Sequence, residues 1–361
     1  MLYDAAIIGA GPAGCAAAIA LARSGFQVLL IEALPFPRHR PGESLHPGVE
    51  PIFEALGVAE QVNAAGFLRH MGHRVAWEPV HKPVCEPVCE PANGLVNGPA
   101  QSVQLQPFGR DARGEWLGYQ AERAPLDAIL LRQAIAQGTT VWQPCRVRAP
   151  VIEGGQLVGL ETDHGPVQAR YILDGTGRSQ WLSRQLGLRF VLHSHALRVR
   201  YGYAVCSAGP NPYDVPLMQR DTDGWTWLAR VSPNRCAWVR LRFDGGDPGG
   251  DWRPPQLDFY PAGPSKGEDV TWRICEDLAG DSWFLLGDAA FILDPAASHG
   301  VLKALMTGMQ AAHLVTDCLR GRLSGAIAAR QYAQWLRTWF EGDARRLREL
   351  YSSPQDPSPT I

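Results

Sequence analysis

The 361-residue sequence lacks three features, each of which would have assigned it to a class. It has no run of about 18 apolar residues, the length that a membrane-spanning helix needs. Its formal net charge is only −2 at pH 7, which argues against a large electrostatic footprint for nucleic acid. Its eight cysteines are scattered, without the density of a secreted disulfide scaffold. We therefore expect a cytoplasmic globular protein with no membrane span and no nucleic-acid partner.

A metal site is also missing from the sequence pattern. Three residues separate Cys85 from Cys89, only His81 is nearby, and no second ligand pair follows at zinc-site spacing. The surrounding segment, 78–101, carries proline at every fourth position from 79 to 91. Because such spacing excludes a continuous helix, we expect an extended surface loop. No metal ion is predicted.

What the sequence does contain is a glycine pattern at its start. Gly9, Gly11 and Gly14 follow the apolar run AAII and open an Ala- and Leu-rich stretch that ends near Gly25. The run VLLI comes next and ends at Glu32. Short apolar runs on either side of a helix are typical of parallel strands that are buried on both faces. The pattern predicts a strand–helix–strand unit.

The chemistry of this unit points to a dinucleotide. Gly9 permits a tight turn, Gly11 lets the backbone approach a pyrophosphate, and Gly14 lets the helix pack on the strand. The helix N-terminus offers N–H groups and partial positive charge to phosphate. Glu32 can accept hydrogen bonds from a ribose diol, and its charge disfavours a 2′-phosphate. The glycines alone do not distinguish FAD from NAD.

A distant stretch, 283–312, makes that distinction. Its strand ends at Gly287 and Asp288, and Asp294-Pro295 and small residues then lead to Ser298-His299-Gly300 and a helix. In this order the chain resembles the FAD-dependent monooxygenases of the p-hydroxybenzoate-hydroxylase type and their relatives, the flavin-dependent halogenases and geranylgeranyl reductases. The resemblance implies that Asp288 holds the ribityl chain and that the helix N-terminus faces the isoalloxazine ring. A helix dipole there favours an anionic reduced flavin by about 0.3–2 kcal/mol.

Three further segments, 37–58, 122–134 and 171–182, resemble the family's cofactor segments in the same order. They imply that Arg40 or Arg38 reaches the adenine dinucleotide, that Arg123 contacts its flavin side, and that Asp174 with Gly175 forms a second turn. FAD is therefore the predicted cofactor. The expected cofactor-binding residues are Gly9, Gly11, Gly14, Glu32, Arg40, Arg123, Asp174, Gly287, Asp288, Gly300 and Val301.

The resemblance also implies the fold, an α/β protein in which a Rossmann-like FAD-binding domain carries a second, antiparallel-sheet substrate domain. The FAD-binding domain would comprise 1–60, 115–182 and 276–345, and the substrate domain 61–114 and 183–275. Residues 346–361 would form a C-terminal tail. Strand-like runs at 198–205, 226–231 and 236–243 supply the antiparallel sheet, and 301–319 and 326–351 are expected to be helical.

The resemblance implies an FAD-dependent oxidoreductase, and our leading hypothesis is a monooxygenase that hydroxylates an aromatic substrate through a flavin C4a-hydroperoxide. The substrate could be an indole or tryptophan, including a tryptophan side chain of a precursor protein during cysteine tryptophylquinone biogenesis; segment 78–101 would then be a docking surface. No second dinucleotide fingerprint is present. Electrons therefore come either from NAD(P)H bound transiently or from a separate flavin reductase.

Three alternatives stay open: a flavin-dependent halogenase, a prenyl reductase, and a non-catalytic FAD-binding assembly factor. Trp225 and Trp227 resemble the first half of the halogenases' Trp-x-Trp-x-Ile-Pro signature, but the Ile-Pro is missing. Segment 66–78 contains no lysine where halogenase-like relatives commonly have one, and His70 is the nearest candidate. The expected catalytic residues are His299, His70 and Pro295.

Two sets of residues could meet a substrate or could simply be structural. Trp225 and Trp227 would line either the substrate or the core, since alternate residues of a strand share one face. The arginines of the two predicted strands would bind an anionic substrate or form a solvated face. These arginines are Arg198, Arg200, Arg240 and Arg242.

Overall fold

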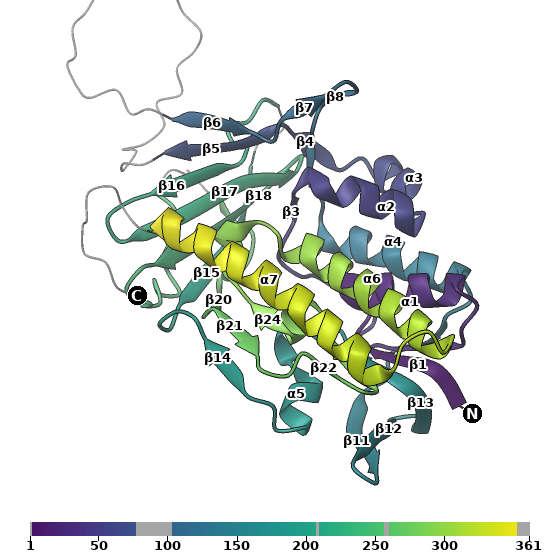
Figure 1. The fold of residues 1–361 in the computed structure, drawn as a ribbon. Coiled ribbons are helices and arrows are strands. Elements are labelled where there is room, and N and C mark those ends of the chain that lie inside the picture. Colours follow the sequence, from purple (N-terminus) through teal and green to yellow (C-terminus); the bar gives the residue numbers. More distant parts are fainter. Residues whose placement is uncertain (1, 77–102, 207–208, 256–259, 352–361) are drawn as a thin grey trace, which may run out of the picture. The chain divides into compact units, whose positions relative to one another are not determined.

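The computed structural model describes residues 2–76, 103–206, 209–255 and 260–351 (Figure 1). The predicted loop at 78–101, the cysteine pair within it and residues 352–361 of the predicted tail lie outside these ranges. The chain divides into two compact units. Unit 1 comprises Met1–Phe67, Ala121–His195 and Val270–Ile361, and unit 2 comprises Leu68–Gln120 and Ala196–Asp269. The domain boundaries drawn from the sequence, and the FAD-binding and substrate-binding roles given to the two domains, remain predictions.

Unit 1 is built on a parallel sheet in the order β10-β2-β1-β13-β23. All four residues of β2 are buried, which explains why this strand is uniformly apolar. The strands of this sheet are β1 (Leu2–Ile8), β2 (Val28–Ile31), β10 (Thr140–Trp142), β13 (Gly165–Asp174) and β23 (Trp283–Leu285). The carboxyl ends of β1, β13 and β23 lie in register beside one another, so the turns that follow them gather at one edge.

Further strands extend this sheet or form a small second one. β12 and β11 continue it on the β13 side in antiparallel fashion, β22 pairs with β23, and β14, β21 and β24 make a separate three-stranded sheet. These strands are β11 (Val147–Glu153), β12 (Gln156–Thr162), β14 (Phe190–Leu192), β21 (Arg273–Cys275), β22 (Ala279–Gly280) and β24 (Phe291–Ile292). Unit 1 also contains the two-residue strand β3 (Ser44–Leu45), which is in neither of these sheets.

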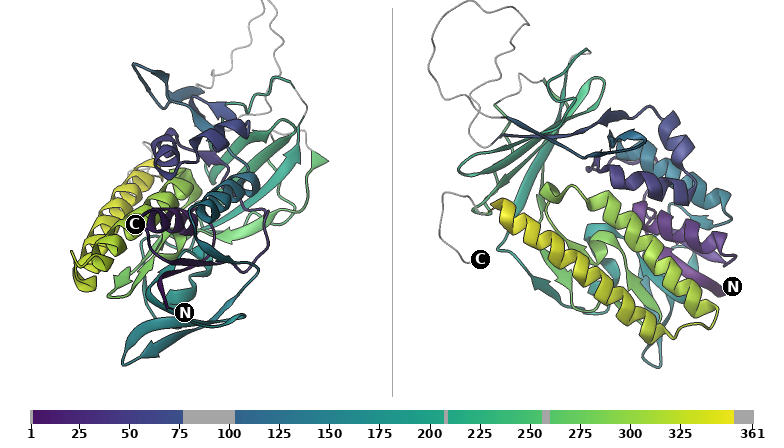
Figure 2. Two further views of the ribbon diagram at one scale, coloured as in Figure 1. Left: turned by 90° about the vertical axis from the view of Figure 1, so that its right-hand side faces the viewer. Right: turned by 45° about the horizontal axis from the view of Figure 1, so that its top comes forward.

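The helices of unit 1 include two long C-terminal ones that run side by side (Figures 1 and 2). Residues 346–351, counted with the tail in the sequence prediction, form the end of the second. The α-helices are α1 (Pro12–Arg23), α2 (Glu50–Leu56), α3 (Ala59–Ala64), α4 (Arg123–Ala136), α5 (Trp181–Gln185), α6 (Gly300–Leu319) and α7 (Gly325–Tyr351). The 3₁₀ turns are η1 (Pro47–Val49), η2 (Gly177–Ser179), η3 (Gly287–Ala289) and η4 (Pro295–Ala297).

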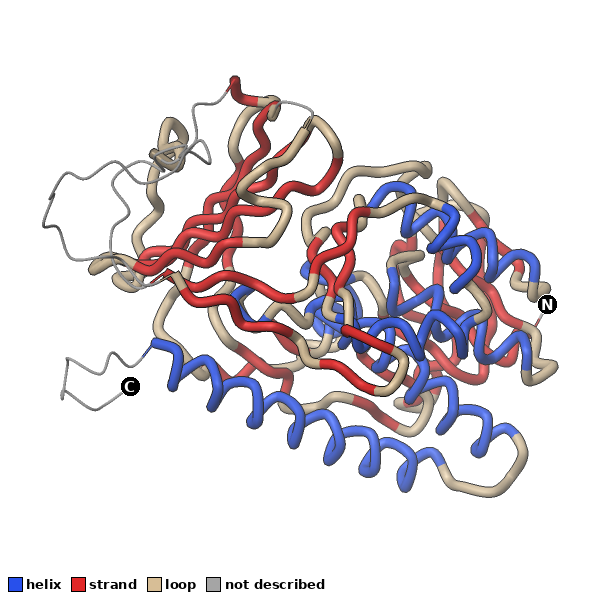
Figure 3. The backbone as a smooth tube through the Cα atoms, turned by 90° about the horizontal axis from the view of Figure 1, so that it is seen from above, coloured by secondary structure: helices blue, strands red, loops and turns tan. Residues whose placement is uncertain are grey.

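Unit 2 is a mainly antiparallel sheet in the order β19-β15-β18-β17-β16-β5-β6, with β20 also paired to β15 (Figure 3, strands in red). β16 and β5 are its one parallel pair among the described residues. The strands of this sheet are β5 (Gly72–Ala76), β6 (Gln104–Pro107), β15 (Arg198–Val205), β16 (Leu217–Arg220), β17 (Gly224–Ser232), β18 (Arg235–Arg242), β19 (Tyr260–Pro261) and β20 (Lys266–Asp269). Unit 2 also contains two short pairs outside it, β4 (Leu68–His70) with β9 (Gly118–Gln120) and β7 (Arg110–Asp111) with β8 (Gly114–Glu115).

The structure confirms the fold class predicted from the sequence, an α/β unit with a Rossmann-like sheet and a second unit dominated by an antiparallel sheet. The first strand–helix–strand unit falls where the glycine pattern placed it, and α1 ends just before Gly25, which has a φ of 88°. None of the helices in the described ranges is long and apolar enough to span a bilayer.

Candidate functional site

The glycine turn after β1 is shaped by close backbone contacts. Gly9 has a φ of 94°, and a Cβ there would lie 2.6 Å from the carbonyl oxygen of Gly175. A Cβ on Gly14 would lie well inside contact distance of the Gly9 carbonyl oxygen. The N–H of Gly175 donates to the carbonyl of Ile8, 2.8 Å away, so the turns after β1 and β13 are joined. Only glycine fits this cradle.

The N-terminus of α1 and the end of β2 face the same turn. Gly11 is the N-cap of α1 and no side chain caps the helix, so its first-turn N–H groups remain available for a ligand. Glu32 is 6% exposed. Its two carboxylate oxygens accept hydrogen bonds from the N–H groups of Ala10 and Leu34, both at 2.9 Å. Glu32 is thereby held beside the glycine turn, as the sequence predicted.

A buried carboxylate, Asp127, organises the arginines near this turn. Asp127 is completely buried and accepts from Nε and Nη2 of Arg123 at 2.9 and 3.1 Å. Arg38 lies 3.7 Å from Asp127 and 3.4 Å from Glu32, while Arg40 is exposed. Of the two arginines weighed from the sequence, Arg38 is thus the one against Glu32. Burial lowers the pKa of Arg38, against the opposing effect of both carboxylates.

Asp174 ends β13 and lies at the second turn that the resemblance implies. It is completely buried, and its two oxygens accept from the N–H groups of Thr176 and Leu182, both at 2.8 Å. Burial raises the pKa of this carboxyl group despite these hydrogen bonds. Its side chain therefore shapes the turn after β13, and the backbone of that turn is what borders the glycine cradle.

The third turn at this edge follows β23. Gly287 has a φ of 53°, and its N–H donates to Oγ1 of Thr307 in α6 at 2.9 Å. Asp288 points outward with 41% of its side chain exposed and lies 3.4 Å from Nε of Arg178. The sequence prediction included Asp288 but missed Arg178, whose only signal was its place four residues after Asp174.

These three turns fit an extended dinucleotide such as FAD. An uncapped helix N-terminus and a glycine cradle suit the pyrophosphate, Glu32 suits a ribose diol, and exposed Asp288 suits the hydroxyl groups of a ribityl chain. The assignment of individual cofactor contacts remains a prediction. Within the described ranges no cluster of His, Cys, Asp or Glu could hold a metal ion.

The segment that leads into α6, together with the first two residues of that helix, holds four of the predicted site residues. Pro295 is exposed and begins η4, with no polar group to act on a substrate. His299 is the N-cap residue of α6 and is partly buried, Gly300 is exposed, and Val301 is buried. The chain enters the helix through Ser298, which has a φ of 51°. Of these residues, only His299 places a titratable group at the helix start.

Residues of α7 complete the surroundings of His299. Nδ1 of His299 lies 3.7 Å from Oδ2 of Asp343, and Nζ of Lys303 lies 2.7 Å from the same oxygen. The ring of His299 meets the ring of His46 edge-on, with centroids 5.4 Å apart. Sequence reasoning missed Asp343 and Lys303. The one available signal was a lysine inside the otherwise apolar run VLKALM.

In unit 2, His70 is a buried neutral base. Its Nδ1 lies 2.8 Å from the carbonyl oxygen of Gly72, and because a carbonyl only accepts, Nδ1 carries the proton. Nε2 is buried and makes no hydrogen bond of good geometry within the described residues, while the backbone of Gly72 and Tyr119 partly opposes the effect of burial on the pKa of His70. Burial lowers the pKa of His70, which is 5% exposed. His70 and His299 belong to different units.

Aromatic rings surround this histidine. His70 and Phe108 have centroids 5.3 Å apart, and His73 lies 6.4 Å from Phe108 and 6.2 Å from Trp227. Burial also lowers the pKa of His73. We refer to His70, His73, Phe108 and Trp227 as the aromatic wall. The expected catalytic and substrate residues included His70 and Trp227 but not His73 or Phe108, which strand pairing brings together.

The two predicted substrate tryptophans differ in exposure. Trp225 is 1% exposed and is among the largest fully buried side chains, so it belongs to the core of unit 2. Trp227 is only partly buried and packs against Tyr203, Ala229 and Val231. Trp227 is therefore the better candidate for a substrate contact.

Three of the four predicted arginines are already paired with aspartates. Arg200 contacts Asp247, Arg240 contacts Asp221 and Arg242 contacts Asp244. Because these guanidinium groups are neutralised within unit 2, the structure favours the structural interpretation over an anion site.

Comparison with known proteins gives one family and several relatives. A protein-family model described as an FAD binding domain matches residues 2–234. The brominase of 1H-pyrrole-2-carbonyl-peptidyl-carrier protein from Pseudoalteromonas luteoviolacea is 25% identical over 359 residues, which cover 88% of this chain and 78% of the relative. The tryptophan 2-halogenase of Chondromyces crocatus is 26% identical over 354 residues, covering 90% of this chain and 63% of the relative.

The same fold recurs in solved structures. The myxobacterial chondrochloren halogenase has a TM-score of 0.80 and 23% identity, and the match covers 98% of this chain and 84% of that one. At this identity the similarity concerns the fold. Together, the family match and the three turns confirm the predicted resemblance to FAD-dependent enzymes of the monooxygenase type and FAD as cofactor.

Proposed function

The chain belongs to the FAD binding domain family, and on that premise we propose that it is a flavin-dependent enzyme that halogenates an electron-rich aromatic substrate. The observation that carries the proposal is its similarity, along 88% and 90% of its length, to a pyrrole brominase and a tryptophan halogenase. These relatives favour halogenation over hydroxylation, which sequence reasoning alone had ranked first.

Unit 1 would bind and orient the cofactor. The first-turn N–H groups of α1 would receive the pyrophosphate, Glu32 the adenosine ribose and Asp288 the ribityl chain. Reduced FAD, when bound, supplies the two electrons with which O₂ is activated. Overall, the aromatic C–H, a halide ion, a proton, reduced FAD and O₂ would yield the carbon–halogen bond, oxidised FAD and two molecules of water.

The aromatic wall of unit 2 would receive the substrate. Flat rings at centroid distances of 5.3 to 6.4 Å leave edges and faces that suit another aromatic ring. The bare Nε2 of His70 can accept a hydrogen bond from an indole or pyrrole N–H, or accept the proton that leaves the ring during substitution. Because burial keeps His70 neutral, it is ready to act as that acceptor near pH 7.

Hydroxylation of an aromatic ring, including a tryptophan side chain in a precursor protein, is the second candidate. The feature that favours it is the absence of lysine from 66–78, where the resemblance to halogenases would place one. A neutral histidine lacks the permanent charge of a lysine. In this reaction O₂ and reduced FAD yield the phenol, oxidised FAD and one water, with no halide.

One assay separates the candidates. The purified chain is loaded with FAD, and a separate flavin reductase with NADH supplies reduced FAD in air, with or without bromide. Pyrrole, indole, tryptophan and tryptophan-containing peptides serve as substrates, and products are read by mass spectrometry. A bromine isotope pair that requires bromide supports halogenation, whereas a gain of one oxygen without halide supports hydroxylation.

Negative results in this assay also discriminate. If the yellow protein yields neither product, the non-catalytic assembly factor becomes the better hypothesis, and anaerobic saturation of a prenyl chain would point to the reductase. Omission of the separate reductase tests whether NAD(P)H reduces the bound flavin directly.

A further inference from the structure

We propose that His299, Asp343 and Lys303 form a buried relay, in which Asp343 orients His299 toward the flavin site and Lys303 holds Asp343 in place. His299 would then hold and donate a proton at Nε2, with the other two acting as positioning residues. The inference rests on the proposed function, because the flavin is what gives His299 a ligand to face.

The choice of lysine at 303 is the first argument. Lys and Arg together number 34, yet the chain has only three lysines, Lys82, Lys266 and Lys303. Lys82 lies outside the described residues and Lys266 is exposed, whereas Lys303 is 6% exposed. A compact ammonium group loses much of its hydration when buried, so a buried lysine needs strong compensation. Lysine is therefore rare in this chain, and Lys303 is the buried one among the two lysines that the structure describes.

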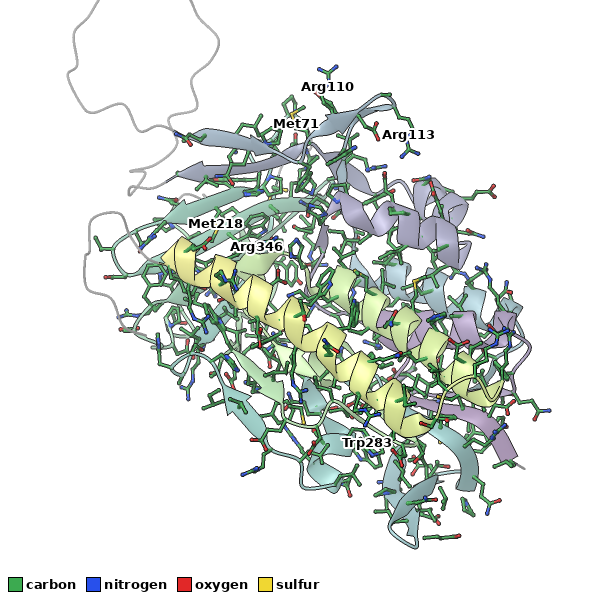
Figure 4. The ribbon with its side chains drawn as sticks, viewed as in Figure 1. Met71, Arg110, Arg113, Met218, Trp283 and Arg346 are labelled. Atoms are coloured by element: carbon green, nitrogen blue, oxygen red, sulfur yellow. The ribbon has the colours of Figure 1, made fainter. Side chains whose placement is uncertain are left out.

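The compensation comes from Asp343 on α7. The Lys303–Asp343 distance is 2.7 Å, and both side chains are only 7% exposed. Lys303 Nζ also lies 5.4 Å from the centre of the Phe291 ring, over its face. Arg346 approaches the other oxygen of Asp343 at 3.6 Å, but its side chain is 75% exposed near the C-terminal end of α7 (Figure 4). Of the two cations Lys303 is therefore the nearer and the more buried, and its contact with Oδ2 of Asp343 is an ion pair without hydrogen-bond geometry.

His299 shares that carboxylate without completing a hydrogen bond. Its Nδ1 is buried, makes no hydrogen bond and faces Oδ2 of Asp343 at 3.7 Å. Although burial acts in the opposite direction, His299 and Lys303 hold the pKa of Asp343 at about 2. On its other side His299 meets His46, whose Nδ1 accepts the N–H of Gly48 at 3.0 Å. The ionisable groups around His299 are thus Asp343, Lys303, Arg346 and His46.

A second contact from α7 fixes the backbone before His299. Asp294 is 2% exposed and accepts from Nε1 of Trp272 at 2.7 Å and from the N–H of Ala296 at 2.9 Å. It also accepts from the hydroxyl group of Tyr351, at the end of α7. The segment 294–299 is therefore held by α7 near both of its ends. Such constraint is what a precisely oriented imidazole needs.

The start of α6 belongs to the dinucleotide edge of unit 1. The Cα of Ala304, the residue after Lys303, would lie 3.4 Å from a Cβ on Gly287, the neighbour of Asp288. His299 precedes Ala304 by little more than one helical turn. A cofactor that extends past Asp288 thus reaches the helix end where His299 lies. Because Nδ1 of His299 faces Asp343, Nε2 is the ring nitrogen that remains to contact the cofactor.

A charged trio is also an unusual way to stabilise a core. Apolar residues of similar volume often stabilise a buried site as well as an ion pair does, or better. Lys303, Asp343 and His299 between α6 and α7 therefore fit a role in proton chemistry better than a role in stability.

The test follows the titration of His299 by NMR in the full-length, FAD-loaded protein, with His299→Gln to assign its resonance. Asp343→Asn should lower the midpoint by about one pH unit, because an opposite charge within about 4–6 Å favours the imidazolium ion. Lys303→Met should raise it by a smaller amount. Arg346→Met, which removes only the exposed partner of Asp343, is the matched control and should leave it unchanged. The pH at which the spectrum of reduced FAD changes should shift with Asp343→Asn and not with the control.

The double variant Lys303→Met/Asp343→Leu guards against misfolding, because it leaves no unpaired buried charge. It should fold as well as the natural chain and still lower the His299 midpoint, by less than Asp343→Asn does, because the loss of the Lys303 charge acts in the opposite direction. If neither it nor Asp343→Asn moves that midpoint further than Arg346→Met does, the relay is overturned. The titration needs no halide and no aromatic substrate, so its outcome is independent of whether the chain halogenates, hydroxylates or does neither.

Discussion

The two units carry candidate ligand groups of different kinds. In unit 1 the cofactor edge is made largely of backbone, in the turns at Gly9–Gly14, Gly175 and Gly287, where an added Cβ would strike a neighbouring chain segment or the φ is positive. In unit 2 the aromatic wall is made of side chains that strand pairing brings together from β4, β5, β17 and the residue after β6. A backbone site tolerates almost no substitution, whereas a side-chain site can change its substrate without losing its fold.

The largest effect expected from this comparison is at Gly14. A methyl group there would overlap the Gly9 carbonyl, so Gly14→Ala should cost about 3 kcal/mol or more and abolish FAD binding. Gly342→Ala on α7 is the matched control, since nothing lies within 4 Å of its Cβ, and it should stabilise the helix by about 0.5–1 kcal/mol. Thermal unfolding and FAD fluorescence would measure both. Normal FAD affinity in Gly14→Ala would refute a backbone-built cofactor site.

The next largest effect is expected at Asp127, the buried carboxylate that Arg38 and Arg123 share. Asp127→Asn leaves Arg38 and Arg123 without their shared carboxylate and should destabilise the protein by about 3 kcal/mol while weakening FAD binding. Asp221→Asn removes the partner of Arg240 in unit 2, where the carboxylate is 30% exposed, and should cost about 1 kcal/mol. Urea unfolding and FAD titration of both variants test this. Equal loss of FAD affinity in the two would contradict the separate roles of the units.

More of the candidate site in unit 1 than in unit 2 could be predicted from the sequence. The reason is that residues close together in the sequence form much of the site in unit 1, whereas strand pairing between distant segments forms the aromatic wall in unit 2. Gly9 and Glu32 follow strand ends within one short motif, so local pattern was enough to predict them, and the resemblance to a known family supplied Asp288. Asp127 and Asp343 act through helix packing, and periodicity indicates which face of a helix is buried but not which partner it meets. His73 and Phe108 become neighbours only through the register of β5 and β6, which no local pattern encodes.

The two tryptophans of β17 allow a comparison within unit 2 between a core side chain, Trp225, and a candidate substrate contact, Trp227. Trp225→Phe should lower the free energy of unfolding by about 1–2 kcal/mol, because it opens a void around a side chain that is 1% exposed. Trp227→Phe should change stability by less than about 0.5 kcal/mol and instead raise KM for the aromatic substrate. Denaturant unfolding and steady-state kinetics separate these effects. If the two variants behaved alike, Trp227 would be a core residue as well.

The smallest expected effect is a pH dependence that belongs to the aromatic wall. Burial lowers the pKa of both His70 and His73 below 6.5, so the unfolded chain binds more protons than the native one as the pH falls. Stability is therefore fully present above about pH 6.5 and declines as the pH falls from there to the pKa values of the folded protein. The loss is about 1.4 kcal/mol for every pH unit by which folding lowers each pKa.

Two variants and a control test this pH dependence. His70→Gln and His73→Gln should each flatten the profile of unfolding free energy between pH 6.5 and about pH 5, measured by urea unfolding at a series of pH values. Because an arginine side chain keeps its charge throughout this pH range and Arg40 is exposed, Arg40→Gln in unit 1 should leave that profile unchanged. An equal flattening in Arg40→Gln would remove the distinction between the units.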